Sequence, residues 1–197
     1  MRVLGLVLIV AAALWRILAV SSPELANFAP LMALAFCGGV YFQSRWMWLV
    51  PFAALGLSDL YINHYYAVQF HYPFPLREWS VRLLCFAAGL GLGRLASRRR
   101  SWLNLLSGIL GASVLFYLVT NTASWLGWSG ELDYPQTFAG WWQAMTVGLP
   151  QYAPTLYFFR NTFTSDLLFT AGFALAMEYV ALRRGEFSLF GAARQRA

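Results

Sequence analysis

Six stretches of mainly apolar residues, separated by short polar segments, run along the chain. An α-helix that crosses a bilayer needs about 20 such residues, and somewhat fewer suffice where neighbouring helices shelter its ends. We therefore predict an all-α integral membrane protein with a bundle of six transmembrane helices. The predicted spans are residues 3–20, 28–42, 46–60, 81–95, 102–119 and 163–182.

The long segment between the fifth and sixth spans, residues 120–162, contains several helix breakers. Within it, residues 135–149 carry apolar side chains at approximate helical spacing, and Pro135 suits a first helical turn. We predict a short helix there that lies in the membrane interface, because Trp141 and Trp142 favour the headgroup level. A partly buried seventh span is the alternative.

The N-terminal apolar run after Arg2 is interpreted as the first span. A signal peptide is the alternative, but no small-residue cleavage site follows and Trp15 and Arg16 interrupt the expected pattern. We expect one transmembrane domain over residues 1–185 and a cytoplasmic tail over residues 186–197.

Composition agrees with a bilayer environment. Hydrophobic residues make up 59% of the chain and charged residues only 11%, too few to cover a soluble domain of this size. All 14 basic residues are arginines and the net charge is +6, but they lie in short runs between apolar stretches. That distribution indicates a membrane topology signal rather than a nucleic-acid surface.

The arginines predict the orientation, because cytoplasmic loops retain basic residues. With both termini inside, ten of the fourteen arginines lie on the cytoplasmic side with two acids. The outer half then holds the other four arginines and six acids. We therefore expect a multi-pass protein of a bacterial inner membrane with both termini in the cytoplasm.

Polar residues gather at one level, near the outer ends of the predicted spans. Ionisable groups at such depth normally face protein or a water-filled cavity, because lipid solvates them poorly. We expect an outward-facing substrate pocket formed by Arg16, Asn27, Asp59, Asn63, His64, Arg82, Asn121, Trp125, Arg160, Asn161 and Asp166.

Arginine forks in this set suit a carboxylate or phosphate, with Asp59 or Asp166 holding the forks in place. Structural ion pairs that tie helix ends together are the alternative. Aromatic residues crowd the two outer loops, residues 61–79 and 120–162, and could cover a flat organic ligand. Packing and the interfacial aromatic belt explain most of them equally well.

No cofactor or metal site is expected. His64 and His71 lack a further ligand cluster, and Cys85 is only a weak candidate should the ligand itself carry a metal. No hydrolase elbow, phosphate-binding glycine loop or zinc-protease helix is present, so we predict no enzyme activity. Gly89, Gly91, Gly93 and Gly108 are interpreted as close helix-packing positions.

A set of short motifs resembles an uncharacterised family of bacterial six-helix membrane proteins. They are residues 27–30 (NFAP), 33–39 (ALAFCGG), Pro51, 58–60 (SDL), 120–121 (TN), Trp125, 134–135 (YP), 161–162 (NT) and Asp166. The resemblance covers most of residues 27–176. That family looks like the substrate-binding S components of energy-coupling-factor (ECF) vitamin transporters, near the solitary cobalamin transporters of that class.

The resemblance implies a six-helix bundle that binds a vitamin-like molecule, possibly cobalamin, near the outer surface and carries it inward. Such S components often present an Ala-x-x-x-Ala signature on their first helix to an ECF energising module. Gly5 and Ile9 stand at that place here. Coupling to such a module and solitary action are therefore both left open. The rival hypothesis is a non-catalytic structural subunit of a larger membrane complex.

Overall fold

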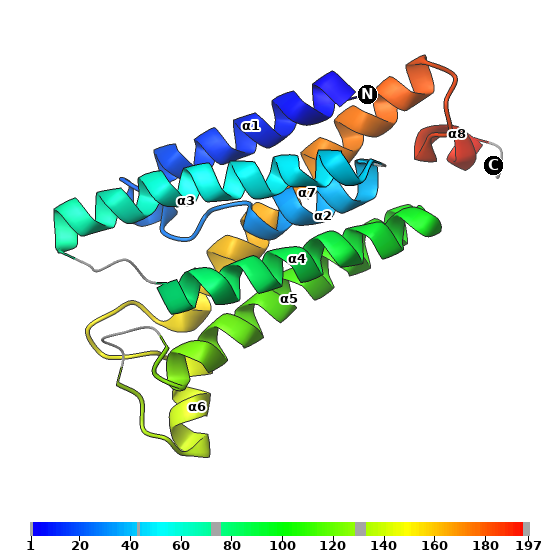
Figure 1. The fold of residues 1–197 in the computed structure, drawn as a ribbon. Coiled ribbons are helices and arrows are strands. Elements are labelled where there is room, and N and C mark those ends of the chain that lie inside the picture. The colour runs from blue at the N-terminus through cyan, green and yellow to red at the C-terminus, as the bar shows by residue number, and fades with distance from the viewer. Residues whose placement is uncertain (1, 43, 72–75, 129–132, 195–197) are drawn as a thin grey trace.

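The computed structural model describes residues 2–42, 44–71, 76–128 and 133–194. Every regular element in these ranges is a helix, which confirms the all-α prediction (Figure 1). The long helices are α1 (Arg2–Ala19), α3 (Leu49–Phe70), α4 (Leu76–Arg98), α5 (Trp102–Trp125) and α7 (Thr155–Arg183). The shorter ones are η1 (Pro23–Leu25), α2 (Leu31–Tyr41), η2 (Arg45–Trp48), α6 (Phe138–Met145) and α8 (Leu189–Arg194).

Four helices in the described part of the chain, α1, α4, α5 and α7, are long and apolar enough to cross a membrane. Helix α2 has 11 residues and is therefore about 17 Å long, roughly half of a hydrocarbon core of about 30 Å. Helix α3 has 22 residues, but residues 61–70 in its second half are polar and aromatic. The structure thus has four candidate spans, and a six-span topology stays a prediction.

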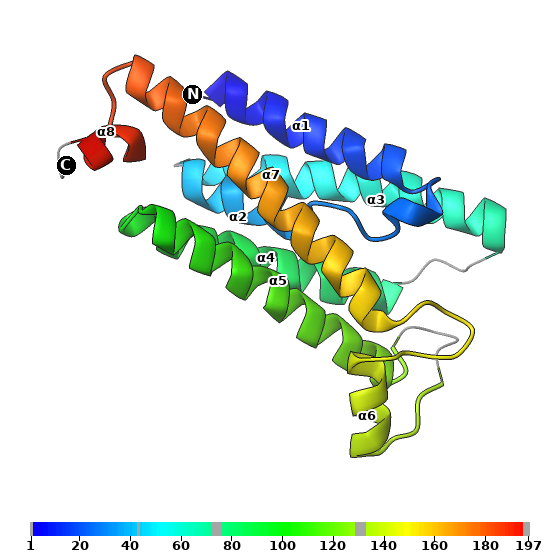
Figure 2. The same ribbon diagram turned by 180° about the vertical axis from the view of Figure 1, so that it is seen from behind.

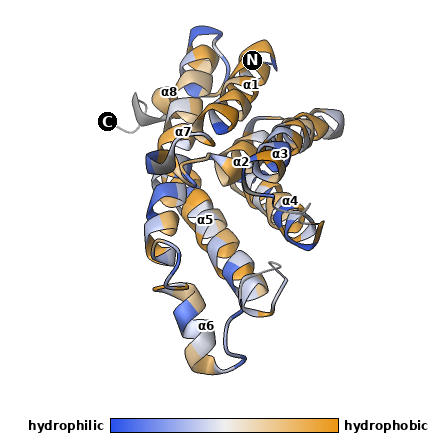
Figure 3. Ribbon diagram, turned by 90° about the vertical axis from the view of Figure 1, so that its left-hand side faces the viewer, coloured by the Kyte–Doolittle hydropathy of each residue, from blue (hydrophilic) through white to orange (hydrophobic). Residues whose placement is uncertain are grey.

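The outer surface of α1 has the pattern of a lipid-facing helix. Its exposed residues include Val3, Val7, Val10, Leu14 and Leu18, which recur every three or four positions. Its buried residues are Gly5, Ile9, Ala12, Arg16 and Ala19, which are small or polar with one exception. Large apolar side chains outside and small or polar ones inside are typical of membrane helices. Figure 3 shows that most of α1 is hydrophobic.

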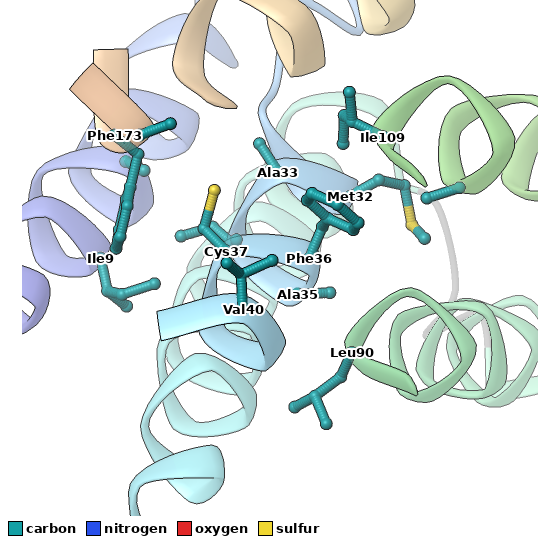
Figure 4. Packing of buried hydrophobic residues seen from close by; sticks show 14 of the residues in the cluster. Ile9, Met32, Ala33, Ala35, Phe36, Cys37, Val40, Leu90, Ile109 and Phe173 are labelled. Carbon is teal, nitrogen blue, oxygen red and sulfur yellow. The ribbon is translucent and has the colours of Figure 1, made fainter. Parts of the chain in front are cut away.

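Helix α2 is the centre of the core. All of its residues except Tyr41 are buried, and it contacts α1, α3, α4, α5 and α7. Figure 4 shows its side chains pointing toward several helices, with Ile9 of α1, Leu90 of α4, Ile109 of α5 and Phe173 of α7 around it. A helix that is apolar on all sides is typical of a membrane span or of an enclosed core, and here five neighbouring helices enclose it.

Close packing between α2 and α4 depends on glycine. A Cβ atom at Gly39 would overlap the backbone carbonyl of Leu90, and one at Gly93 would overlap the backbone carbonyl of Phe36. Gly89 and Gly108 face Met32 and Phe36, as the prediction of close helix packing requires. The prediction is wrong for Gly91, which is not a close-packing position, because no atom lies within 4 Å of its ideal Cβ position.

Four helices extend further than the sequence analysis predicted, and one of them is α4, which covers Leu76–Arg98 rather than residues 81–95. Residues 61–70, assigned to an outer loop, continue α3, since the chain reaches no proline before Pro73. His71 ends α3 in the left-handed conformation with φ 55°. Helix α5 continues to Trp125, where Gly127 with φ 76° follows. Helix α7 begins directly after Pro154 rather than at residue 163.

A short helix within residues 135–149 is present, as predicted, and it is α6; it begins at Phe138, so Pro135 lies before it rather than in its first turn. Its location in the membrane interface stays a prediction. Thr137 is its N-cap and accepts a hydrogen bond of 3.1 Å from the backbone N–H of Gly140. The Tyr117 hydroxyl donates to the carbonyl of Met145 and so joins α6 to α5. Figures 1 and 2 show α6 at one end of the bundle, with both chain termini and the α4–α5 turn at the other end.

Candidate functional site

A cavity of about 520 Å³ opens at the end of the bundle where α1, α3 and α5 finish and α4 and α7 begin. That volume is typical of sites for small organic molecules. The charged and amide side chains that line it are Arg16, Asn27, Glu78, Arg82 and Asn121, and the aromatic ones are Tyr66, Phe116, Tyr117, Tyr134, Tyr152, Phe158 and Phe159.

One wall of the cavity contains a buried ion pair between α1 and α3. Arg16 Nη2 donates to Asp59 Oδ1 at 2.5 Å, and Arg16 Nη1 donates to the Ser58 hydroxyl at 2.5 Å. Both side chains of the pair are almost fully buried, at 3% and 1% exposure. The carboxylate therefore holds the Arg16 fork in one orientation beside the cavity.

Arg82 of α4 is the second cation at Asp59. Its Nη1 atom lies 4.0 Å from the same Oδ1 atom, and its side chain is 21% exposed. Asp59 thus lies near two arginines of the predicted site, and its close partner is Arg16. Arg82 is thus held more loosely and can contact a molecule in the cavity without breaking the short ion pair.

Three buried polar atoms on α1 and α3 have no hydrogen-bond partner, and of their residues Arg16 lines the cavity. They are Arg16 Nε, Asp59 Oδ2 and Asn63 Nδ2, and the other two such side-chain atoms in the described ranges belong to Ser165 and Thr170 of α7. Native proteins leave few buried polar groups unpaired, and each such group needs an explanation. Their concentration beside a cavity is the pattern expected where a ligand or ordered water completes the hydrogen bonding.

Aromatic rings form the opposite side of the cavity. Tyr117 of α5 and Phe159 of α7 lie with ring centroids 4.2 Å apart, and both line the cavity. Tyr134 lies in the connection before α6, where burial raises the pKa of its hydroxyl. An ordinary tyrosine hydroxyl already has a pKa of about 10, so Tyr134 is protonated at neutral pH and keeps an O–H group at the cavity edge.

Of the eleven predicted site residues, four line the cavity: Arg16, Asn27, Arg82 and Asn121. Asp59 lies directly behind Arg16, and Asn63 is on α3 one turn later. The Asn121 side chain donates to the carbonyl of Tyr117 in its own helix at 2.8 Å. Its amide oxygen accepts no hydrogen bond from the described residues and is the part available to a ligand.

Five other predicted residues are not among those that line the cavity. His64 is exposed on α3. Trp125 Nε1 donates to the carbonyl of Pro135 at 2.9 Å. Arg160 lies over the Tyr157 ring at 4.4 Å, and Asn161 Nδ2 donates to the carbonyl of Ala26 at 3.0 Å. The fifth, Asp166, is buried deeper in the bundle.

The weak candidate Cys85 also lies outside the cavity lining. Its side chain is buried in a small apolar cluster with Val81 and Ala123. No group of three or more metal-ligating His, Cys, Asp or Glu side chains occurs among the described residues. His71 follows the last residue of α3, at the same end of the bundle as the cavity. It is seven residues beyond His64.

A protein family matches residues 1–188, which is nearly the whole chain. The chain belongs to the DUF6580 family. This is a family of unknown function, in agreement with the predicted uncharacterised membrane family. No curated protein and no solved structure matches the chain significantly. DUF6580 membership gives no link to ECF S components, so that part of the resemblance stays a hypothesis.

Asp166 has a structural role in this DUF6580 member. Its Oδ1 atom accepts a hydrogen bond from the backbone N–H of Ala33 at 3.0 Å, and its Oδ2 atom accepts one from the Ser113 hydroxyl at 2.6 Å. Ala33 is in the first turn of α2, so a carboxylate from α7 caps this buried helix. Because Asp166 takes these N–H groups, the start of α2 is not a free anion site.

A third buried carboxylate, Glu178 of α7, was not among the predicted site residues. Glu178 is fully buried and lies 3.3 Å from Arg100 Nε. It also accepts hydrogen bonds from the Tyr41 hydroxyl at 3.1 Å and from the backbone N–H of Leu189 at 2.8 Å. This cluster attaches α8, which lies within the predicted tail, to α7. The available signal was a second acid, besides Asp166, inside the predicted span 163–182.

Several cavity residues were also missed. Thr120, Thr155 and Thr162 line the cavity, as do Leu149 and Gly148 from the connection after α6. Hydroxyl and small apolar residues carry no distinctive pattern in a membrane sequence. Whether they line the cavity depends on how the connecting segments fold over the helix ends. Hydrophobic periodicity along the sequence does not predict that folding.

Proposed function

We propose that this chain is a membrane uptake component that binds a small vitamin-like molecule in the cavity and carries it inward. The observation that carries the proposal is the wall at Asp59, where two arginines converge beside an open cavity and the buried atoms Arg16 Nε and Asp59 Oδ2 lack partners. A purely structural ion pair is expected to satisfy its own polar atoms.

The distribution of arginines supports an outward-facing cavity. Arg98, Arg99 and Arg183 lie at the end of the bundle that holds both termini, and the cavity is at the opposite end (Figure 1). Under the positive-inside rule the termini are cytoplasmic and the cavity opens to the outside of a bacterial inner membrane. An ECF-type bundle in which α2 and α3 serve as two further, irregular spans is consistent with this orientation.

Solitary action fits the surface of α1 better than coupling to an ECF module. The small residue Gly5 points inward, since its ideal Cβ position lies 2.5 Å from the Phe42 ring. The exposed positions among residues 2–10 of α1 are Arg2, Val3, Val7 and Val10. A closely packed helix–helix interface with a partner favours small residues on the outer face, and this end of α1 exposes larger ones.

Mass spectrometry of the protein after gentle purification in nanodiscs tests the proposal. We expect a bound small organic molecule on the wild type and on Arg160→Leu, whose side chain lies outside the cavity lining. Arg82→Leu should lose this molecule while it remains folded, because Arg16 still pairs with Asp59.

The rival hypothesis, a structural subunit of a larger membrane complex, gives a different result in the same experiment. It predicts that protein subunits co-purify with the chain and that no small molecule is retained through Arg82. That result would overturn the uptake proposal.

A further inference from the structure

We propose that the ligand of this cavity is a planar organic anion of one or two rings, whose carboxylate is bound by Arg82 beside Arg16. This inference rests on the proposed function and specifies the chemical class that the site selects. It follows from the charge, the hydrogen-bond donors, the rings and the size of the cavity.

Two guanidinium groups at the wall share one carboxylate oxygen, the Oδ1 atom of Asp59. Arg16 has the short contact, at 2.5 Å, and Arg82 has the long one, at 4.0 Å. Glu78 is a second acid in the cavity lining and lies in the first turn of α4, where the helix dipole favours its negative charge. A ligand carboxylate could therefore bind Arg82 at closer range than Asp59 does, without breaking the short Arg16–Asp59 pair.

Arg16, which lines the cavity, has a buried donor without a partner, its Nε atom. Asn63 Nδ2, one turn beyond Asp59 on α3 and outside the cavity lining, is a second such donor, and Asp59 Oδ2 is an unpaired acceptor. Arg82 adds a guanidinium group whose contact with Asp59 is long, at 4.0 Å. A carboxylate offers acceptor sites only and can take two parallel bonds from an arginine fork.

The rest of the cavity suits a flat ring. Tyr66 of α3, Tyr117 of α5, and Phe158 and Phe159 of α7 line it from three helices. Aromatic side chains bind planar molecules through stacked or edge-to-face contacts. The Tyr117 and Phe159 rings, with an interplanar angle of 34°, provide a ready surface of this kind.

Size limits the ligand further. A volume of about 520 Å³ accommodates a drug-sized molecule. Cobalamin, with its corrin ring and nucleotide loop, is far larger than such a molecule. The cavity therefore favours a smaller ring carboxylate over the corrinoid that the family resemblance suggests.

Three simple probes separate charge from planarity. Naphthalene-2-carboxylate has both features, naphthalene-2-carboxamide has the same rings without the charge, and octanoate has the charge without the rings. Binding to the purified protein in nanodiscs at pH 7 can be measured by calorimetry. We expect the naphthoate to bind at least about tenfold more tightly than either of the other two, since one charge-assisted bidentate contact separates it from the amide.

Matched variants tie the result to the proposed residues. Arg82→Gln should weaken naphthoate binding by at least about tenfold, and Arg160→Gln should leave it unchanged. Equal binding of the amide and the carboxylate, or no effect of Arg82→Gln, would overturn the anion proposal. If a neutral molecule is then found on the purified protein, the uptake proposal stands and only the ligand class fails. If no probe binds and no molecule is carried, both fail.

Discussion

Asp59→Leu is expected to destabilise the protein more than any other single substitution at the cavity. The change leaves Arg16 buried at 4% exposure without its carboxylate, and it also removes the only acidic contact recorded for Arg82 among the described residues. Loss of one partner of a buried ion pair typically costs about 3–5 kcal/mol. The measurement is the free energy of unfolding in a mixed-micelle denaturant titration.

A double-mutant comparison isolates the buried charge as the cause. Arg16→Leu together with Asp59→Leu removes both members of the pair, so the double variant should be more stable than Asp59→Leu alone. Asp133→Leu is the matched control, because Asp133 is an exposed acid at the same end of the bundle. A loss below about 1 kcal/mol for Asp59→Leu, the range of an exposed pair, would mean that water reaches Arg16 freely.

Gly93→Ala is expected to have the second largest effect. The new methyl group would overlap the backbone carbonyl of Phe36 in α2, and backbone atoms of a central helix have little freedom to move away. Overpacking of a core costs typically about 1–3 kcal/mol and sometimes more. Thermal unfolding of the purified variant measures this loss.

Gly91→Ala is a control on the same helix, two residues away. Its ideal Cβ position has no atom within 4 Å, and alanine favours a helix over glycine by roughly 0.5–1 kcal/mol. The Gly91 variant should therefore be as stable as the wild type or slightly more stable. Equal losses for the two variants would show that α2 and α4 do not pack as closely as the structure describes.

The depth of polar residues in the bundle was predictable from the sequence, but their direction around each helix was not. Arg16, Asp59 and Arg82 were expected at one level because each lies near the outer end of a predicted span. Which arginine is the close partner of Asp59 depends on helix rotation, and the structure places Arg16 there. Rotation is set by packing between helices that are far apart in sequence.

Helix boundaries are a second feature that the sequence did not predict accurately. The sequence analysis ended the third predicted span at residue 60, where polar residues begin, whereas α3 continues to Phe70. Hydrophobicity reports where lipid contact ends, but a helix ends where its backbone hydrogen bonding is interrupted. Likewise, Asp166 caps α2 at Ala33, 133 residues away in the sequence, and no local sequence pattern predicts such a contact.

The claim that the cavity at Arg16 and Arg82 is a ligand site is tested most directly by an experimental density map of the protein purified gently in nanodiscs. We predict compact density for a small molecule between Arg82 and the rings of Tyr117 and Phe159, within hydrogen-bond distance of the Arg82 guanidinium. A cavity that holds only lipid chains, or one that protein side chains fill while Arg82 turns away from it, would contradict the account.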